Sequence, residues 1–174
     1  GAAFLWVGEH ERDDVHPVSI SNYYKRAVEG RSSFHMEFDW TGTFDPTAWC
    51  AVPTAIEFMG SLLPEGWEQL RHRNRRLALE ARDILCEALG IDPPAPDEMI
   101  GSLAALPLSD REEPAELDPF QTDPLQAELR REHGFEVPVI DWPASPKRLL
   151  RVSCQLYNYR EQYERLAEVL EGIV

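Results

Sequence analysis

The first residues that could bind an anion form a short turn, "TGT" at residues 41–43, just ahead of an Asp-Pro pair. Asp45 is of a type that caps helices, and Pro46 suits the first helical position because proline has no N–H to leave unpaired there. A glycine, a hydroxyl and backbone amides placed just before a helix can form an anion site. Most turns of this composition only start a helix, so the pattern leaves both interpretations open.

A second candidate is an arginine inside the apolar segment "RLLRVSCQLY" that begins at residue 148. Side chains alternate across a strand, so Arg151 and Ser153 lie on the face opposite Leu150. An arginine keeps such a position when its planar guanidinium meets a carboxylate of the chain or an anionic ligand. A surface ion pair therefore stays as open as a ligand site. The turn and the arginine together would suit a ligand with two negative groups.

The composition limits the partners. The chain has 174 residues, enough for one domain or one and a half, and a formal net charge of −14. This charge argues against nucleic acid and anionic membranes as partners. The basic run "RHRNRR" at residues 71–76 lies within a helical pattern and is interpreted as a solvated face with acidic neighbours. No apolar run is long enough to span a membrane and no signal peptide begins the chain, so we expect a cytoplasmic protein.

The cysteines predict no metal site. Cys50, Cys86 and Cys154 are widely spaced, and neither they nor the five histidines show the spacing of metal ligands. We expect buried, reduced thiols.

The hydrophobic periodicity predicts a small α+β domain. A long helix is expected at residues 67–89, ended by Gly90, because apolar residues recur there at helical spacing. Strands at residues 99–108, 135–142 and 147–157 surround a helix that Asp123 and Pro124 begin, and a last helix follows. This order predicts an antiparallel sheet with helices on one face.

The earlier residues are predicted separately. "GAAFLWV" at residues 1–7 is interpreted as a buried strand, and residues 18–38 as irregular with a short strand or two. A helix is expected from Asp45 to about Leu63, with a kink at Pro53. A polar loop is expected at residues 109–120.

Two motifs together resemble a known family. "DWTGTFDPTAWCAVPTAIEFM" at residues 39–59 and "RVSCQLYN" at residues 151–158 are similar to the carboxy-terminal part of class V aminotransferase-fold enzymes. These are pyridoxal-phosphate (PLP) enzymes of fold type I. The isopenicillin N epimerase-like subgroup is the most similar in pattern, and cysteine desulfurases share the "GT" and "R-x-S" elements. The resemblance covers essentially the whole chain.

The resemblance implies roles for three residues. The threonine of the "GT" pair, here Thr43, would reach across a homodimer interface to the cofactor phosphate of the partner subunit, and Gly42 would allow the close backbone approach. The arginine of "R-x-S", here Arg151, would bind the α-carboxylate of an amino-acid substrate. Asn158, in the family's "YN" pair, is expected to cap a helix, with Glu161 completing a capping box.

The chain departs from the family at the lysine that forms the Schiff base with PLP. In the family this lysine precedes a strand that "GAAFLWV" resembles, and neither Lys25 nor Lys147, the two lysines present, matches its motif. The resemblance therefore implies that this chain lacks the catalytic base. Covalent attachment of PLP to one of its lysines would test this expectation. Residues 1–66 would be the end of the large domain with its connecting segment, and residues 67–174 the small domain. An upstream PLP-binding segment or chain would be a partner.

Three functions remain open from the sequence. The leading one is the carboxy-terminal portion of a PLP enzyme acting at Cα, most similar to an epimerase and inactive alone. A cysteine desulfurase or C–S lyase of the same superfamily is the alternative, although residues 106–120 lack the cysteine that a desulfurase carries there. A stand-alone, non-catalytic binding or dimerisation module is the third.

Overall fold

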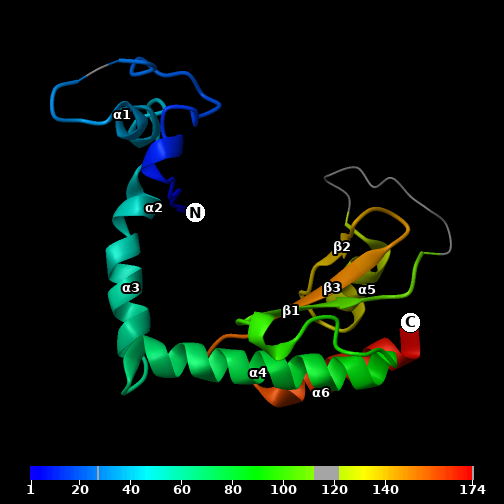
Figure 1. Cartoon of the computed structure of the whole chain (residues 1–174). Coiled ribbons are helices and arrows are strands. Elements are labelled where there is room, and N and C mark those ends of the chain that lie inside the picture. Colours follow the sequence, from blue (N-terminus) through cyan, green and yellow to red (C-terminus); the bar gives the residue numbers. More distant parts are fainter. Residues whose placement is uncertain (27, 112–121, 174) are drawn as a thin grey trace. The chain divides into compact units, whose positions relative to one another are not determined.

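The computed structural model describes residues 1–26, 28–111 and 122–173. These residues form two compact units, 1–59 and 60–174 (Figure 1). The loop predicted at residues 109–120 lies mostly outside the described residues.

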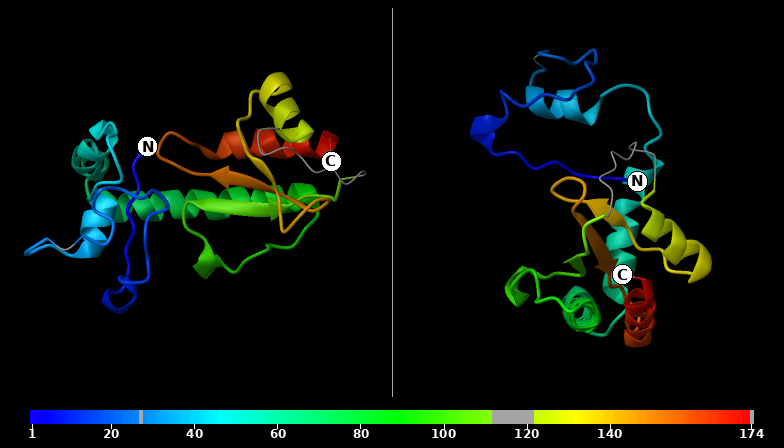
Figure 2. Two further views of the ribbon diagram at one scale, coloured as in Figure 1. Left: turned by 90° about the horizontal axis from the view of Figure 1, so that it is seen from above. Right: turned by 90° about the vertical axis from the view of Figure 1, so that its right-hand side faces the viewer.

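The unit of residues 60–174 has the predicted α+β fold. Its three-stranded sheet has the order β1-β3-β2, and both strand pairs are antiparallel. Helices α4 and α6 lie side by side on one face of the sheet, as the right-hand view of Figure 2 shows. Its elements in chain order are α4 (Gly66–Leu89), the short 3-10 helix η2 (Asp97–Met99), β1 (Leu103–Pro107), α5 (Pro124–Glu132), β2 (Val139–Asp141), β3 (Arg148–Ser153) and α6 (Arg160–Ile173).

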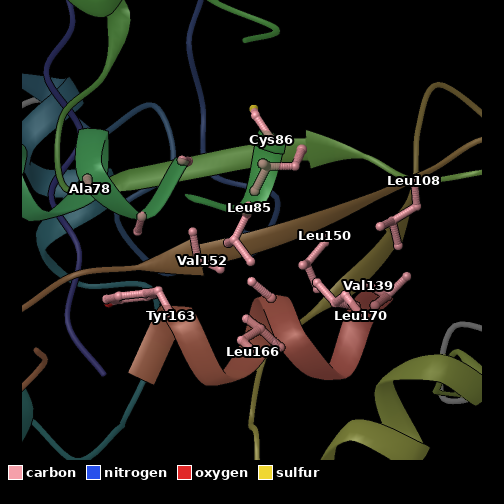
Figure 3. Close-up of a cluster of buried hydrophobic side chains, with 14 of the residues drawn as sticks. Ala78, Leu85, Cys86, Leu108, Val139, Leu150, Val152, Tyr163, Leu166 and Leu170 are labelled. Carbon is pink, nitrogen blue, oxygen red and sulfur yellow. The ribbon is translucent and has the colours of Figure 1, made fainter. Parts of the chain in front are cut away.

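The core of this unit lies between the sheet and its helices. Alternate residues of β1 and β3 are buried, and Leu106, Leu150 and Val152 have no exposed surface. Leu85 of α4 and Leu170 of α6 face them across the core (Figure 3). Each buried leucine contributes about 1.5–3 kcal/mol relative to an exposed one, so this contact fixes which face of the sheet points inward.

The ends of α4 and α5 follow local sequence signals. Gly90 ends α4 with a φ of 64°, a left-handed conformation that glycine adopts without strain. The Asp123 carboxylate accepts a hydrogen bond from the backbone N–H of Leu125 at 2.8 Å, and Pro124 occupies the first helical position. The predictions for both helices are confirmed.

Asp123 also belongs to a buried ionic network that the sequence did not indicate. Its side chain is completely buried and forms ion pairs with Arg111 and Arg148. Arg111 Nη1 lies 2.6 Å from Asp141 Oδ1 on β2, and Arg148 Nε donates to the carbonyl of Ser109 at 3.1 Å. The network therefore ties the start of α5 to β2 and β3.

The unit of residues 1–59 differs from the prediction. Residues 1–7 form no strand, and Phe4 and Trp6 are 93% and 80% exposed. A strand needs a hydrogen-bonded neighbour, and no described residue pairs with this segment. The prediction for residues 18–38 was wrong in two ways: an isolated bridge between Val28 and Arg31 replaces the expected strands, and a helix, α1, begins at Ser33 where no regular element was expected. The elements of this part are the 3-10 helix η1 (Glu9–Glu11), α1 (Ser33–Asp39), α2 (Thr47–Cys50) and α3 (Val52–Ser61).

The helix expected from Asp45 is divided into α2 and α3. Asp45 Oδ1 accepts the backbone N–H of Thr47 at 2.9 Å, so its capping role is confirmed. The helical run is interrupted at Ala51, two residues before the proline, and this break replaces the predicted kink. Pro53 therefore lies in the first turn of α3, where its missing N–H costs no intrahelical bond. No described helix is both long and apolar enough to cross a membrane.

We expect Asp123→Asn to lower the free energy of unfolding of residues 60–174 by about 3 kcal/mol or more, because it removes the carboxylate that pairs with Arg148 and leaves Arg111 with Asp141 alone, and both guanidinium groups are largely shielded from water. Urea unfolding followed by circular dichroism measures the change. The matched control is Glu128→Gln on the exposed side of α5, expected to change the value by less than about 0.5 kcal/mol. Equal stability of the two variants would contradict the role of the network.

Candidate functional site

The turn at residues 41–43 has a geometry that requires glycine. Gly42 has a φ of 140°, and open space surrounds the place where a Cβ would stand. A larger residue would be strained by its backbone alone. Thr43 is exposed, so its hydroxyl and its surroundings are accessible to a ligand.

Aromatic side chains hold the two sides of this turn together. The rings of Trp40 and Phe44 have centroids 5.9 Å apart, and those of Phe44 and Trp49 are 4.7 Å apart. The N–H of Thr47 donates to the Asp45 carboxylate and holds its pKa below the usual range. The turn is thus braced from both ends. Helix α2 has only four residues, so the donors for an anion here are the Thr43 hydroxyl and the amides of the turn rather than a helix terminus.

Arg151 lies on the outer face of the sheet, as the alternation of β3 predicts. Leu150 and Val152 beside it are fully buried, whereas Arg151 is exposed. Its register partner on β1 is Ala105, which offers no carboxylate. Among the described residues Arg151 has no ion pair, so the alternative of a surface salt bridge is not realised there.

Arg151 lines a pocket of about 410 Å³ beside the C-terminal end of β3. Residues 133–138 and the first turns of α6 form its walls, and Tyr157, Tyr159 and Arg165 also line it. The backbone N–H of Arg151 donates to the carbonyl of Pro138 at 3.0 Å, which fixes the strand at the pocket. The pocket is therefore bordered by Arg151, which has no ion pair with any described residue, and by aromatic residues.

Tyr163 makes the base of this pocket rigid. Its hydroxyl donates to the carbonyl of Ser153 at 2.8 Å and accepts the thiol of Cys154 at 3.0 Å. Burial raises the pKa of both the Tyr163 hydroxyl and the Cys154 thiol, so both groups stay protonated. These groups position β3 and do not serve as nucleophiles.

The segment before α6 is held by side-chain amides. Asn158 Oδ1 accepts the N–H of Gln155 at 3.0 Å, and Gln162 Oε1 accepts the N–H of Tyr159 at 3.1 Å. Asn158 therefore caps the turn that precedes the helix, and the capping box predicted with Glu161 does not form. Gln162 takes that role because α6 begins one residue later than the pattern suggested.

The two lysines occupy other positions: Lys25 lies in the unit of residues 1–59, and Lys147 directly precedes β3. Lys25 has a left-handed φ of 53°, and its backbone N–H is bound to Glu37. Lys147 closes the connection between β2 and β3, where its carbonyl accepts the N–H of Trp142. Neither lysine lines the pocket that contains Arg151.

Glu37 is a buried acid that the sequence did not single out. Its side chain is 2% exposed and accepts the Lys25 N–H at 2.8 Å and a hydrogen bond from His16 Nδ1 at 2.7 Å. The N–H of Lys25 lowers the pKa of Glu37, and His16 acts in the same direction, whereas burial opposes them. Glu37 therefore ties both ends of residues 16–25 to α1.

The described part of the chain contains no cluster of metal-binding side chains. All three cysteines are free. Cys86 and Cys154 are buried as expected, but Cys50 is exposed, because the short helix α2 buries none of its residues.

Three known proteins are similar to almost the whole chain. An isopenicillin N epimerase of Amycolatopsis lactamdurans is 33% identical over 184 residues, covering 99% of this chain and 43% of the relative. An isopenicillin N epimerase of Streptomyces clavuligerus is 28% identical, with the same two shares covered. A probable chloroplastic L-cysteine desulfhydrase of Arabidopsis thaliana is 27% identical, covering 99% of this chain and 36% of the relative.

The chain is homologous to these proteins over 99% of its length. The resemblance to class V aminotransferase-fold enzymes is thereby confirmed. The chain spans less than half the length of each of these relatives. No family model matches it.

The lowered pKa of Glu37 predicts a pH-dependent stability. A carboxyl group with a depressed folded pKa stabilises the fold above the ordinary glutamate pKa, and the contribution disappears as the pH falls through the folded value. We expect Glu37→Gln to be less stable than the unmodified chain at neutral pH, and the two urea-unfolding midpoints to converge in acid. Glu29→Gln, an exposed change in the same unit, is the control. Parallel pH curves for Glu37→Gln and the unmodified chain would contradict this role.

Proposed function

We propose that this chain is part of a PLP-dependent enzyme that acts at the Cα of an amino-acid substrate, most similar to an isopenicillin N epimerase. The homology to two epimerases supports the class of reaction. The observation that carries the proposal is that Arg151 is exposed, lines a pocket beside β3 and forms no ion pair with any residue that the structure describes. The residues at the two family motifs have the chemistry that the class requires.

Arg151 would bind the α-carboxylate of the substrate. A guanidinium forms two parallel hydrogen bonds with a carboxylate, which fixes both the position and the orientation of the attached Cα. Its strand is rigid, since buried neighbours and Tyr163 hold it. Rigid presentation keeps the reacting bond in one orientation and lowers the entropic part of the barrier.

Gly42 and Thr43 would bind the phosphate group of PLP. The residues present fit this group because the turn has an accessible hydroxyl and open space above a glycine. In the homodimer implied by the family, Thr43 would serve the cofactor of the partner subunit. When bound, PLP supplies an electron sink that stabilises negative charge at the Cα of the substrate.

The chain as it stands lacks a lysine suited to act as Schiff-base partner and general base, and we propose that it is inactive alone. The proton at Cα would be moved by a group of an upstream segment or chain. The role of this chain is to bind the carboxylate and the phosphate and so to orient the bond that breaks.

An L-cysteine desulfhydrase activity is the alternative, favoured by the similarity to the plant relative. The two reactions have different products. An epimerase exchanges the Cα hydrogen with solvent and inverts its configuration, whereas a desulfhydrase releases sulfide from L-cysteine. If the parent enzyme incorporates deuterium at the Cα of its substrate and releases no sulfide, the epimerase activity is favoured. Release of sulfide from L-cysteine would favour the desulfhydrase activity.

Borohydride reduction of the 174-residue chain with PLP tests the cofactor assignment. We expect no specific adduct on Lys25 or Lys147, because neither lies in the pocket with Arg151. Intact mass and peptide mapping locate any adduct. A stoichiometric adduct on either lysine would make the chain a self-sufficient PLP protein and would overturn the proposal that it lacks the base. Absence of PLP from the parent enzyme as well would instead favour a non-catalytic module.

Arg151→Gln in the parent enzyme is expected to raise KM for the amino-acid substrate about 10- to 100-fold, since a charged hydrogen-bonded pair contributes about 1.5–3 kcal/mol. Arg151→Lys should recover only part of this loss, because an ammonium cannot form the fork. Arg130→Gln, an exposed change on α5, is the matched control. An unchanged KM with normal folding would remove Arg151 from the substrate site.

A further inference from the structure

The basic run at residues 71–76 has no part in the proposed function. Its residues belong to α4, where positions three and four apart share a face. His72, Arg73 and Arg76 accordingly line one pocket, together with Glu80 a turn further on. Two arginines of the run, Arg73 and Arg76, therefore border the same cavity.

The beginning of α6 forms the other side of this pocket. Asn158, Tyr159 and Arg160 line it opposite α4, and its volume is about 430 Å³. Helices α4 and α6 pack against each other, which holds the two sides in place (Figure 1). The 14-residue helix α6 also begins here, and the N-terminal end of a helix carries partial positive charge. A cavity of this size accommodates a small phosphorylated molecule.

The cations of this pocket outnumber its acids. Three arginines line it against one glutamate. Glu80 lies 3.7 Å from Arg76, and Arg160 is paired with Glu164 at 2.6 Å. Arg73 forms no ion pair with any described residue, so the expected acidic neighbours are present for only part of the run.

Like charges three residues apart on a helix repel each other. Arg73 and Arg76 are such a pair, and Arg160 adds a third guanidinium from the facing helix. A bound oxyanion would turn this repulsion into attraction, because several guanidinium groups can donate to one phosphate. The feature stands out in a chain whose net charge is −14.

We propose that this pocket binds a compact phosphate-bearing anion with at least two negative charges. Arg73, Arg76 and Arg160 supply the charged donors, and His72 and Tyr159 border them. The site shares no residue with the turn at Gly42 and Thr43, and Arg151 does not line it. Asn158 and Tyr159 also line the pocket that contains Arg151, so the two pockets adjoin, but the three arginines of this site do not line that pocket. The proposal does not depend on the proposed function.

Calorimetric titration of the 174-residue chain with inorganic pyrophosphate, at low and constant ionic strength, tests the proposal. We expect one saturable site per chain and a binding constant at least tenfold weaker in Arg73→Gln and in Arg160→Gln. Arg130→Gln removes the same charge outside the pocket and should bind as the unmodified chain does. Thr43→Val should also leave pyrophosphate binding unchanged, which separates this site from the proposed cofactor phosphate.

ADP in place of pyrophosphate distinguishes the source of the phosphate. Equal affinity would assign recognition to the diphosphate alone, and tighter binding of ADP would assign the site to an organic phosphate; both results support the proposal. Absence of saturable binding, or equal weakening in Arg130→Gln, would overturn it. Tighter binding of a hexaglutamate peptide than of pyrophosphate would also overturn it and would make the surface a contact for an acidic protein segment.

Discussion

The alternation of side chains along β3 is the constraint on which the candidate site depends. Leu150 and Val152 are completely buried against α4 and α6, and a shift of one residue would expose both and bury Arg151 instead. Exposing two large apolar side chains and burying an unpaired charge would cost several kcal/mol. The apolar core therefore keeps the guanidinium on the outer face, where a carboxylate can reach it.

Polar contacts on both sides of Arg151 fix the position of β3 in addition to the apolar core. Arg148, three residues before Arg151, is held by the buried Asp123, and the carbonyl of Ser153, two residues after it, is held by Tyr163. The strand is thus fixed on both sides of the functional residue. Breaking either contact would loosen the site without changing any residue that touches a ligand, which is why such supporting contacts matter for a binding site.

The two units have different degrees of internal support. Residues 60–174 form a continuous apolar core, whereas the buried residues among those described in 1–59 are Phe34, Met36 and Glu37. In residues 1–59, local contacts take the place of a core. Glu37 holds the segment between His16 and Lys25, and aromatic contacts hold the turn at Gly42. The assignment of residues 1–66 to a large domain stays a prediction. The apolar residues Phe4 and Trp6 of residues 1–7 are exposed, and no described residue pairs with this segment to form a strand.

The sequence by itself determined the features that local chemistry decides. Gly90 and Asp123 set helix ends, the period of β3 set the face of Arg151, and the order of strands and helices followed from hydrophobic periodicity, so most of the fold of residues 60–174 was predictable. Only the tertiary structure decided the rest. The pairing of Asp123 with Arg111 and Arg148, the Glu37 contacts and the pocket shared by Arg73 and Arg160 join residues distant in the chain, and no local spacing encodes such contacts. The same reason explains the failed strand at residues 1–7: a strand is stabilised by its neighbours, and its own sequence does not supply them.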